Sequence, residues 1–407
     1  MKHTSTLDPY IPELSQPSLK EKSSDSKVET TREDSMQIMN RKRRVWLVIL
    51  VVGIAAAWII FIKERFVMND PSPTVSFVQN HMTNPNGTLA TYLQDAPSED
   101  EDIVAGREAL SESLGLWMQY AVAKNDQVLF EQAYDQLTTY FLMPQNYIAW
   151  KLDANGASHV TTNALGDDFR IVDALLKAAD QWGQSREEKL TIASEIVRTL
   201  TQSVQNKGYY VDFHDFAHGN TPDTATLSLV YVDLRALQAM EQHEMLEPGT
   251  YAKYESLLKG MPNDGLFYPK TFNVETKKYT YDDTINLIDQ LIVANHLTVI
   301  GRKPDKLITF LKKEFNTRHR LPGQYKRSER TPAVSYESPS VYGLAILLAV
   351  QSGDPKWAQQ LYNHMITLRN LDKAYPGGYV FDGNTHMFDN LFPLLGETEL
   401  NKFLEKY

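Results

Sequence analysis

The chain has 407 residues, no cysteine, a formal net charge of -10, and 42% hydrophobic and 23% charged residues. These fractions are typical of a globular protein and exclude whole-chain disorder and collagen-like repeats. The absence of cysteine excludes disulfides, thiolate nucleophiles, iron–sulfur clusters and cysteine-based zinc sites. The acidic balance argues against a nucleic-acid partner, because sequence-independent binding of nucleic acid requires a basic face.

The first 44 residues are predicted to be a disordered tail. Residues 1–40 contain a single aromatic residue, Tyr10, among many serines and charged residues. Such a segment cannot bury enough apolar surface to offset the entropy that ordering costs. The tail ends in the basic run RKRR at 41–44.

An uncharged apolar run of 18 residues follows at 45–62. At about 1.5 Å per residue it is near the minimum length of a helix that spans a bilayer. A cleavable signal peptide would have a shorter apolar core nearer Met1 and an Ala-x-Ala site after it, whereas Lys63-Glu64-Arg65 follows here. A buried core helix is the other alternative, and it is disfavoured because the run is apolar on every face and flanked by charges.

The charges on either side of this run predict its orientation. Four basic residues precede the run, and two, interrupted by Glu64, follow it. The positive-inside rule then places the N-terminus in the cytoplasm and the rest of the chain outside. We therefore expect a single-pass protein of the cell membrane, with a cytoplasmic tail at 1–44, an anchor at 45–62, a linker at 63–82 and one extracellular domain at 83–407.

The extracellular part shows apolar residues at helical spacing almost throughout, so the predicted fold class is all-α. The spacing predicts twelve helices, at 103–122, 127–141, 168–182, 186–205, 224–243, 249–258, 283–300, 305–315, 338–350, 355–368, 387–395 and 397–407.

The predicted helices recur in pairs. Landmarks near the start of every odd helix are 51 to 58 residues apart; they are Glu112, Asp168, Thr226, Asp283, Ser338 and Asp389. A period of this size indicates a repeated α-hairpin. Six hairpins can close into a double ring with the odd helices inside, although an open solenoid has the same repeat. In a closed ring the inner helices would all start at one end, so acidic residues near those starts would converge on one cleft.

Three acidic positions could carry chemistry. Glu112 lies in an apolar, glycine-containing stretch, where desolvation would raise its pKa and suit a general acid; the alternative is a surface glutamate. Asp168 follows Asp167 at a helix start, where one of the two could be the N-cap. The same alternative applies to Asp282 and Asp283, and Asp289 could be a salt-bridge partner.

Taken together, these stretches resemble a known family. Residues 111–118 read SESLGLWM, 168–176 read DFRIVDALL, and 283–286 read DTIN. SLVY at 228–231, SPSVY at 338–342 and FDN at 388–390 follow the same order. From about residue 83 to the C-terminus the chain is similar to glycoside hydrolase family 8. It departs from the family pattern at three positions, with Ser113 for a glycine, Gly166 for the first aspartate of an Asp-x-Asp pair, and Asn286 for an arginine.

The resemblance implies an (α/α)6 barrel and hydrolysis of a glycosidic bond with inversion. In that mechanism one carboxylic acid protonates the leaving oxygen and a carboxylate activates water on the opposite face of the sugar. The family's acid corresponds to Glu112 and its base to Asp283, or to Asp282 if the alignment slips by one residue. Asp168 corresponds to a carboxylate that holds the sugar or the water.

The resemblance calls for no cofactor and no metal. His214 and His218 are four residues apart but have no third ligand in the sequence, so a metal site is not expected. Aromatic rings suit the apolar faces of sugars, and we expect Trp117, Tyr231 and Tyr281 to bind the substrate, although each could instead fill the core.

Three functions remain open at this point. The leading interpretation is a membrane-anchored endo-glycosidase that acts on a β-linked polysaccharide, either a β-1,4-glucan or an exopolysaccharide. The second is a catalytically impaired polysaccharide-binding module, to which Gly166 and Asn286 point. The third is a polysaccharide lyase with a Tyr/His pair. The departures suggest a divergent branch, like the members that accompany polysaccharide synthesis, so polysaccharide synthase machinery is a possible partner.

Overall fold

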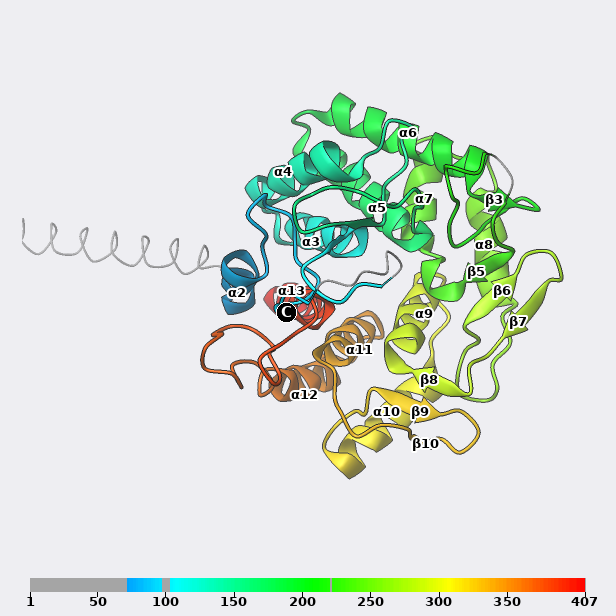
Figure 1. Ribbon diagram of the computed structural model, residues 1–407. Coiled ribbons are helices and arrows are strands. Elements are labelled where there is room, and N and C mark those ends of the chain that lie inside the picture. The colour runs from blue at the N-terminus through cyan, green and yellow to red at the C-terminus, as the bar shows by residue number, and fades with distance from the viewer. Residues whose placement is uncertain (1–71, 97–102, 220–221, 407) are drawn as a thin grey trace, which may run out of the picture. The chain divides into compact units, whose positions relative to one another are not determined.

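Six helices pack side by side around a closed ring in the computed structural model (Figure 1). Each of them contacts the next in the chain, and the last, α13, returns to the first, α3. The six are α3 (Ser111–Lys124), α5 (Leu165–Trp182), α7 (Leu234–Gln242), α9 (Leu287–Val299), α11 (Pro339–Gln351) and α13 (Phe388–Glu405). The ring is therefore closed, as the period predicted, and is not an open solenoid.

The structure describes residues 72–96, 103–219 and 222–406. The predicted tail, the predicted anchor at 45–62 and the first part of the predicted linker lie outside this range. Within the described residues, no helix combines the length and the apolar character needed to cross a bilayer.

A second set of helices lies outside the ring. Most of them pack on an inner helix: α4 on α3, α6 on α5, α8 on α7, α12 on both α11 and α13, and α2 on α13. The outer helices are α2 (Pro73–His81), α4 (Gln127–Gln136), α6 (Arg186–Ser203), α8 (Thr250–Lys259), α10 (Asp305–Arg318) and α12 (Pro355–Met365). Ten of the 13 residues of α11 are buried, but only three of the 14 of α10. The inner helices are thus the core of the domain, because neighbours cover them on several sides.

The last predicted pair of helices was wrong. The sequence predicts two helices after residue 387, with a break before Glu397, but α13 runs through both segments with Pro393 inside it. The missing outer partner is α2, which lies within the segment predicted as a linker. Thr74 of α2 donates a hydrogen bond from Oγ1 to the carbonyl of Gly377 at 2.8 Å, and Phe77 packs against Gly378.

Short antiparallel sheets precede several inner helices and delay their starts. β5 (Thr226–Ser228) and the 3-10 turn η2 (Leu229–Tyr231) come before α7, and β8 (Thr284–Asn286) comes before α9, where the sequence predicted helix. β5 pairs with β6 (Thr271–Asn273), which pairs with β7 (Lys278–Thr280). β8 pairs with β9 (Gln324–Lys326), which pairs with β10 (Thr331–Pro332). Ile285 faces Tyr325 in this register.

The remaining short elements form two antiparallel strand pairs and a π-turn. β1 (Ala109–Leu110) pairs with β2 (Lys151–Leu152) across the segment that contains α3 and α4, and β3 (Gln205–Asn206) forms a hairpin with β4 (Tyr209–Tyr210). The π-turn η1 (Leu137–Phe141) extends α4. β1 leads directly into α3 and so fixes where that inner helix begins.

Two glycines let α11 and α13 approach each other closely. A β-carbon at Gly343 would lie 2.6 Å from the backbone nitrogen of Pro393, and one at Gly396 would lie 2.6 Å from the carbonyl oxygen of Gly343. Carbon atoms pack best at about 3.5–4.0 Å, so any side chain at either position would push the helices apart. This contact lies next to the joint between α13 and α3 that closes the ring.

We predict that Gly343→Ala destabilises the domain by about 1–3 kcal/mol, the usual cost of overpacking a tight core. Chemical denaturation followed by circular dichroism measures the change. Ser194→Thr adds one carbon to the exposed face of α6 and should change the stability by less than about 0.5 kcal/mol. Equal stability of the Gly343→Ala variant and the wild type would show that the helices do not need this close contact.

Candidate active site

Glu112 lies in the first turn of α3, at the end of the ring where the inner helices begin. Its side chain is 29% exposed, and its Oε1 lies 3.8 Å from Nη1 of Arg170. Burial raises the pKa of Glu112 to about 8; the charges of Asp167 and Asp289 also raise it, and the Arg170 guanidinium opposes them. A carboxyl group in this environment holds its proton at neutral pH and can donate it, as a general acid must.

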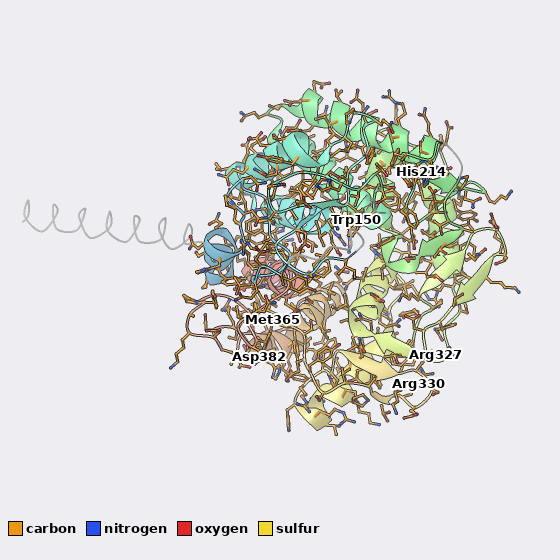
Figure 2. All side chains as sticks on the ribbon, in the orientation of Figure 1. Trp150, His214, Arg327, Arg330, Met365 and Asp382 are labelled. Carbon is orange, nitrogen blue, oxygen red and sulfur yellow. The ribbon has the colours of Figure 1, made fainter. Side chains whose placement is uncertain are left out.

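Asp167 and Arg170 form a charged cluster with Glu112. Oγ of Ser111 donates a hydrogen bond to Oδ2 of Asp167 at 2.7 Å, and Nη1 of Arg170 lies 3.3 Å from Oδ1 of Asp167. Arg170 passes beside Gly115, where a β-carbon would lie 3.2 Å from its Cδ. The Trp150 carbonyl accepts the backbone N–H of Ser111 at 3.0 Å, which fixes the start of α3. Figure 2 labels Trp150 above this part of the ring.

Asp168, which the resemblance assigns to the sugar or the water, points into the protein. It is completely buried, and its Oδ2 accepts a hydrogen bond from Nδ2 of Asn163 at 2.6 Å. Oδ1 of Asn163 in turn accepts the backbone N–H of His214 at 2.8 Å. Burial raises the pKa of Asp168 well above its ordinary value. Within α5 it is therefore Asp167, and not Asp168, that the structure places beside Glu112.

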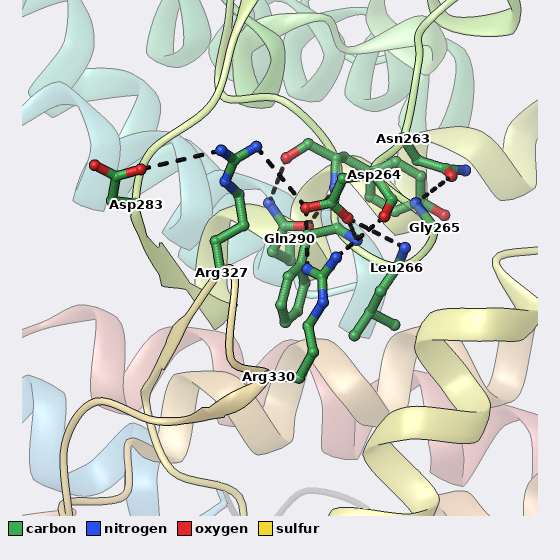
Figure 3. Close-up of polar contacts among 10 residues, drawn as sticks. Asn263, Asp264, Gly265, Leu266, Asp283, Gln290, Arg327 and Arg330 are labelled. Carbon is green, nitrogen blue, oxygen red and sulfur yellow. Dashed lines mark hydrogen bonds and ion pairs between the residues drawn. The ribbon is translucent and has the colours of Figure 1, made fainter.

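The two aspartates before β8 differ sharply in their surroundings. The side chain of Asp283 is fully exposed, and its Oδ1 lies 4.0 Å from Nη2 of Arg327 (Figure 3). Asp282 is 41% exposed, and its Oδ2 lies 2.9 Å from Nζ of Lys270. The guanidinium of Arg327 also lies over the ring of Tyr281, 4.8 Å from its centroid.

A second arginine, Arg330, anchors the β9–β10 turn that also carries Arg327. Nη1 of Arg330 lies 3.0 Å from Oδ2 of Asp264 and donates a hydrogen bond to it. Arg327 lies between Asp264 and Asp283, so one aspartate is held in the protein and the other extends into solvent (Figure 3).

The helix-cap alternatives for the aspartates are wrong at both helices. The N-cap of α5 is Ala164, which has no side-chain cap bond. The N-cap of α9 is Asn286, whose Oδ1 accepts the backbone N–H of Ile288 at 2.9 Å. The residue that departs from the family's arginine thus has a local structural role. It starts α9 three residues before Asp289.

Tyr231 occupies the space that the family pattern gives to an aspartate. A β-carbon at Gly166 would lie 2.7 Å from Cε1 of Tyr231, so the ring lies directly against the glycine. Burial raises the pKa of Tyr231 far above its ordinary value, and the charges of Asp167 and Glu112 raise it further. Tyr231, which was predicted to bind the substrate, therefore lies close to Asp167 and Glu112.

Trp117 does not lie with these residues. It is 5% exposed, stacks on Tyr120 with ring centroids 5.5 Å apart, and lines a separate cavity of about 360 Å³ with Leu114 and residues of α4. Positions 112 and 117 are five residues apart, which on an α-helix is about 140° around the axis. The structure therefore places Trp117 on another face of α3 than Glu112, lining that separate cavity.

The two histidines considered as metal ligands each pair with an aspartate. Nδ1 of His214 lies 2.7 Å from Oδ2 of Asp223, and Nδ1 of His218 lies 2.9 Å from Oδ2 of Asp215. The residues that the structure describes contain no group of three or more His, Asp and Glu side chains that could hold a metal ion.

We predict that Gly166→Ala destabilises the domain by about 1–3 kcal/mol, because its β-carbon would collide with the ring of Tyr231. The same substitution in a Tyr231→Ala background should cost much less, since residues in contact are not additive. A double-mutant cycle of unfolding free energies measures this coupling. Additive effects would show that the ring does not fill the space at position 166.

Comparison with known proteins agrees with this architecture. Residues 77–219 match the family model of glycosyl hydrolases family 8. The chain is 38% identical over 331 residues to the putative lipoprotein YdaJ of Bacillus subtilis (strain 168), covering 81% of this chain and 86% of that protein.

Solved structures have the same fold. An α-amylase from Clostridium perfringens is 25% identical with a TM-score of 0.71, and the match covers 80% of this chain and 96% of that one. PssZ from Listeria monocytogenes is 24% identical with a TM-score of 0.64, over 81% and 96% of the two chains. The match to the family model, the identity to YdaJ and the closed ring of helices show that the chain belongs to glycosyl hydrolase family 8 and is a glycoside hydrolase.

Proposed function

We propose that the protein is an endo-acting glycosidase that hydrolyses a β-linked polysaccharide with inversion, with Glu112 as its general acid. The polysaccharide is a β-1,4-glucan or a related exopolysaccharide. The observation that carries the proposal is the environment of Glu112, which is partly exposed at the end of the ring and has a pKa of about 8. A general acid needs both access to the substrate and a proton at neutral pH.

The base must lie across the sugar from Glu112, with about 6.5–9.5 Å between the two carboxyl groups to leave room for water. The family resemblance nominates Asp283, with Asp282 as the alternative. Both precede α9, and α9 is the inner helix opposite α3 in the order of helix contacts. The segment that enters α9 is therefore the proposed source of the base.

We expect Glu112→Gln to lower turnover of the polysaccharide by about 10²–10⁴-fold while binding survives, because the amide keeps the shape but donates no proton. Activity of the wild type should fall as the pH rises through about 8, since the pKa of Glu112 is raised to that value and the acid form is then lost. Reducing-end release across a pH series measures both effects. Wild-type activity of the Glu112→Gln variant would refute the assignment.

An α-linked glucan is a second candidate substrate. It is favoured by the likeness to the Clostridium perfringens protein, whose description is an α-amylase. Release of reducing ends from β-glucans, chitosan, bacterial exopolysaccharide and starch, each with the described domain and its Glu112→Gln variant, separates the candidates. Release from starch alone would replace the β-linked proposal.

A binding module without turnover is the competing function. It rests on Gly166 and Asn286, where the family pattern has an aspartate and an arginine, and on the burial of Asp168. Binding to one of these polysaccharides with no release of reducing ends, and no effect of Glu112→Gln, would favour it.

We further propose that residues 45–62 anchor the enzyme in the cell membrane with the catalytic domain outside. The uncharged run and the four basic residues before it support this orientation. Protease added to intact cells should digest the domain and spare a tag at Met1, and protection of the domain would reverse the proposed topology.

A further inference from the structure

Asp289 lies in the first turn of α9, on the opposite side of the ring from Glu112. The contacts run α3, α5, α7, α9 in one direction and α3, α13, α11, α9 in the other, so α9 is the third helix from α3 either way (Figure 1). Both residues are in the first turns of their helices. Because successive inner helices start at the same end of the ring, Glu112 and Asp289 face each other across its mouth.

The size of the ring fits two carboxylates that serve one sugar. Packed helices lie about 8–10 Å apart, so the axes of opposite helices in a six-membered ring are about 16–20 Å apart. A glutamate and an aspartate that extend inward from those helices leave a gap comparable to the 6.5–9.5 Å that inverting hydrolysis needs. The charge of Asp289 also raises the pKa of Glu112, which agrees with the two side chains being near each other.

The carboxylate of Asp289 is half-buried and unengaged. It makes no hydrogen bond and no ion pair with any residue in the described part of the chain. Its charged neighbours are Lys270, which lowers its pKa, and Asp282, which raises it, while burial raises it most. The ammonium of Lys270 is itself bound to Asp282 at 2.9 Å. Asp289 therefore has free acceptor oxygens for a water molecule.

Neither Asp282 nor Asp283 is both partly buried and free of bonded partners. Asp283 is fully exposed on the loop before β8, on the side of Arg327. Asp282 has its carboxylate occupied by Lys270. Of the three, only Asp289 lies on an inner helix, partly shielded from solvent and free of partners.

We propose that Asp289 is the general base that deprotonates the attacking water. This assignment rests on the proposed function, with Glu112 as the acid, and it moves the base from the loop before α9 into the helix itself. Asp282 and Lys270 then form a charged pair beside the base, and Asp283 belongs to the loop beside Arg327.

The step balances without any further reactant. The oxygen of water forms a bond to the anomeric carbon while the bond from that carbon to the glycosidic oxygen breaks. One proton of the water passes to the Asp289 carboxylate, and the proton of Glu112 passes to the leaving oxygen. Both groups return to their starting states by exchanging protons with solvent.

An activated substrate distinguishes the base from the acid. Dinitrophenolate leaves without being protonated, so dinitrophenyl β-cellotrioside needs a base but no acid; dinitrophenyl α-maltotrioside replaces it if starch is the polymer cleaved. The Glu112→Gln variant should turn over the polysaccharide about 10²–10⁴-fold more slowly than the wild type. Its turnover of the activated substrate should be close to that of the wild type. The Asp289→Asn variant should turn over both substrates about 10²–10⁴-fold more slowly than the wild type. The fall of activity at low pH, which reports the ionisation of the base, should also disappear in this variant.

The comparison is completed by three further variants, Asp282→Asn, Asp283→Asn and the control Asp305→Asn. Asp305→Asn changes an exposed aspartate in the first turn of the outer helix α10 and should behave as wild type. Circular dichroism and substrate binding by calorimetry verify that Asp289→Asn is folded. The assignment is overturned if Asp289→Asn turns over the activated substrate normally while Asp282→Asn or Asp283→Asn does not. Normal turnover of the polysaccharide by Glu112→Gln would instead overturn the proposed function.

Discussion

The contact of α13 with α3 is the interaction on which the rest of the structure depends. It joins the two ends of the helical domain and turns a row of hairpins into a ring. Only in a ring do α3 and α9, more than 160 residues apart in the chain, present the starts of their helices to one space. The tight packing of α11 on α13, with glycine at positions 343 and 396, brings α13 to this position. The fold thus assembles a site from segments that have no local reason to meet.

Electrostatics at the mouth of the ring follows from that assembly. Helix starts favour negative charge, because their free N–H groups carry partial positive charge, and Glu112, Asp167 and Asp289 all lie in first turns. Burial opposes their ionisation and raises the pKa of all three. The positive charges of Arg170 and Lys270, one on each side of the ring, oppose this effect and lower the pKa of the neighbouring carboxyls. The result is a group of carboxyls whose pKa values are all raised, that of Glu112 to about 8, and a raised pKa is what a general acid requires.

The sequence predicted the ring well because its period of paired helices reflects how each hairpin packs. It predicted the details of the site less well. Alignment of motifs cannot distinguish Asp167 from Asp168, since one residue of shift turns a side chain by about 100° around a helix. Here only Asp167 shares Arg170 with Glu112. Asp289 was predicted as a salt-bridge partner at most, and its position opposite Glu112 depends on ring closure. Trp117 shows the same limit, because an aromatic residue close to Glu112 in sequence can lie on another face of the helix. The helix break expected before Glu397 failed because tertiary packing of α13 overrides the local signals of Pro393 and Gly396.

The contact between Gly166 and Tyr231 constrains the order in which this site can change. An aspartate at position 166, as in the family pattern, has no room while the tyrosine ring lies there, and removing the ring alone leaves a void beside two carboxyls. A substitution at position 166 or 231 alone lowers the stability of the domain, so the family pattern fits only if the two positions change together. The residues at 166 and 231 are therefore coupled, and the effect of a substitution at one of them depends on which residue occupies the other.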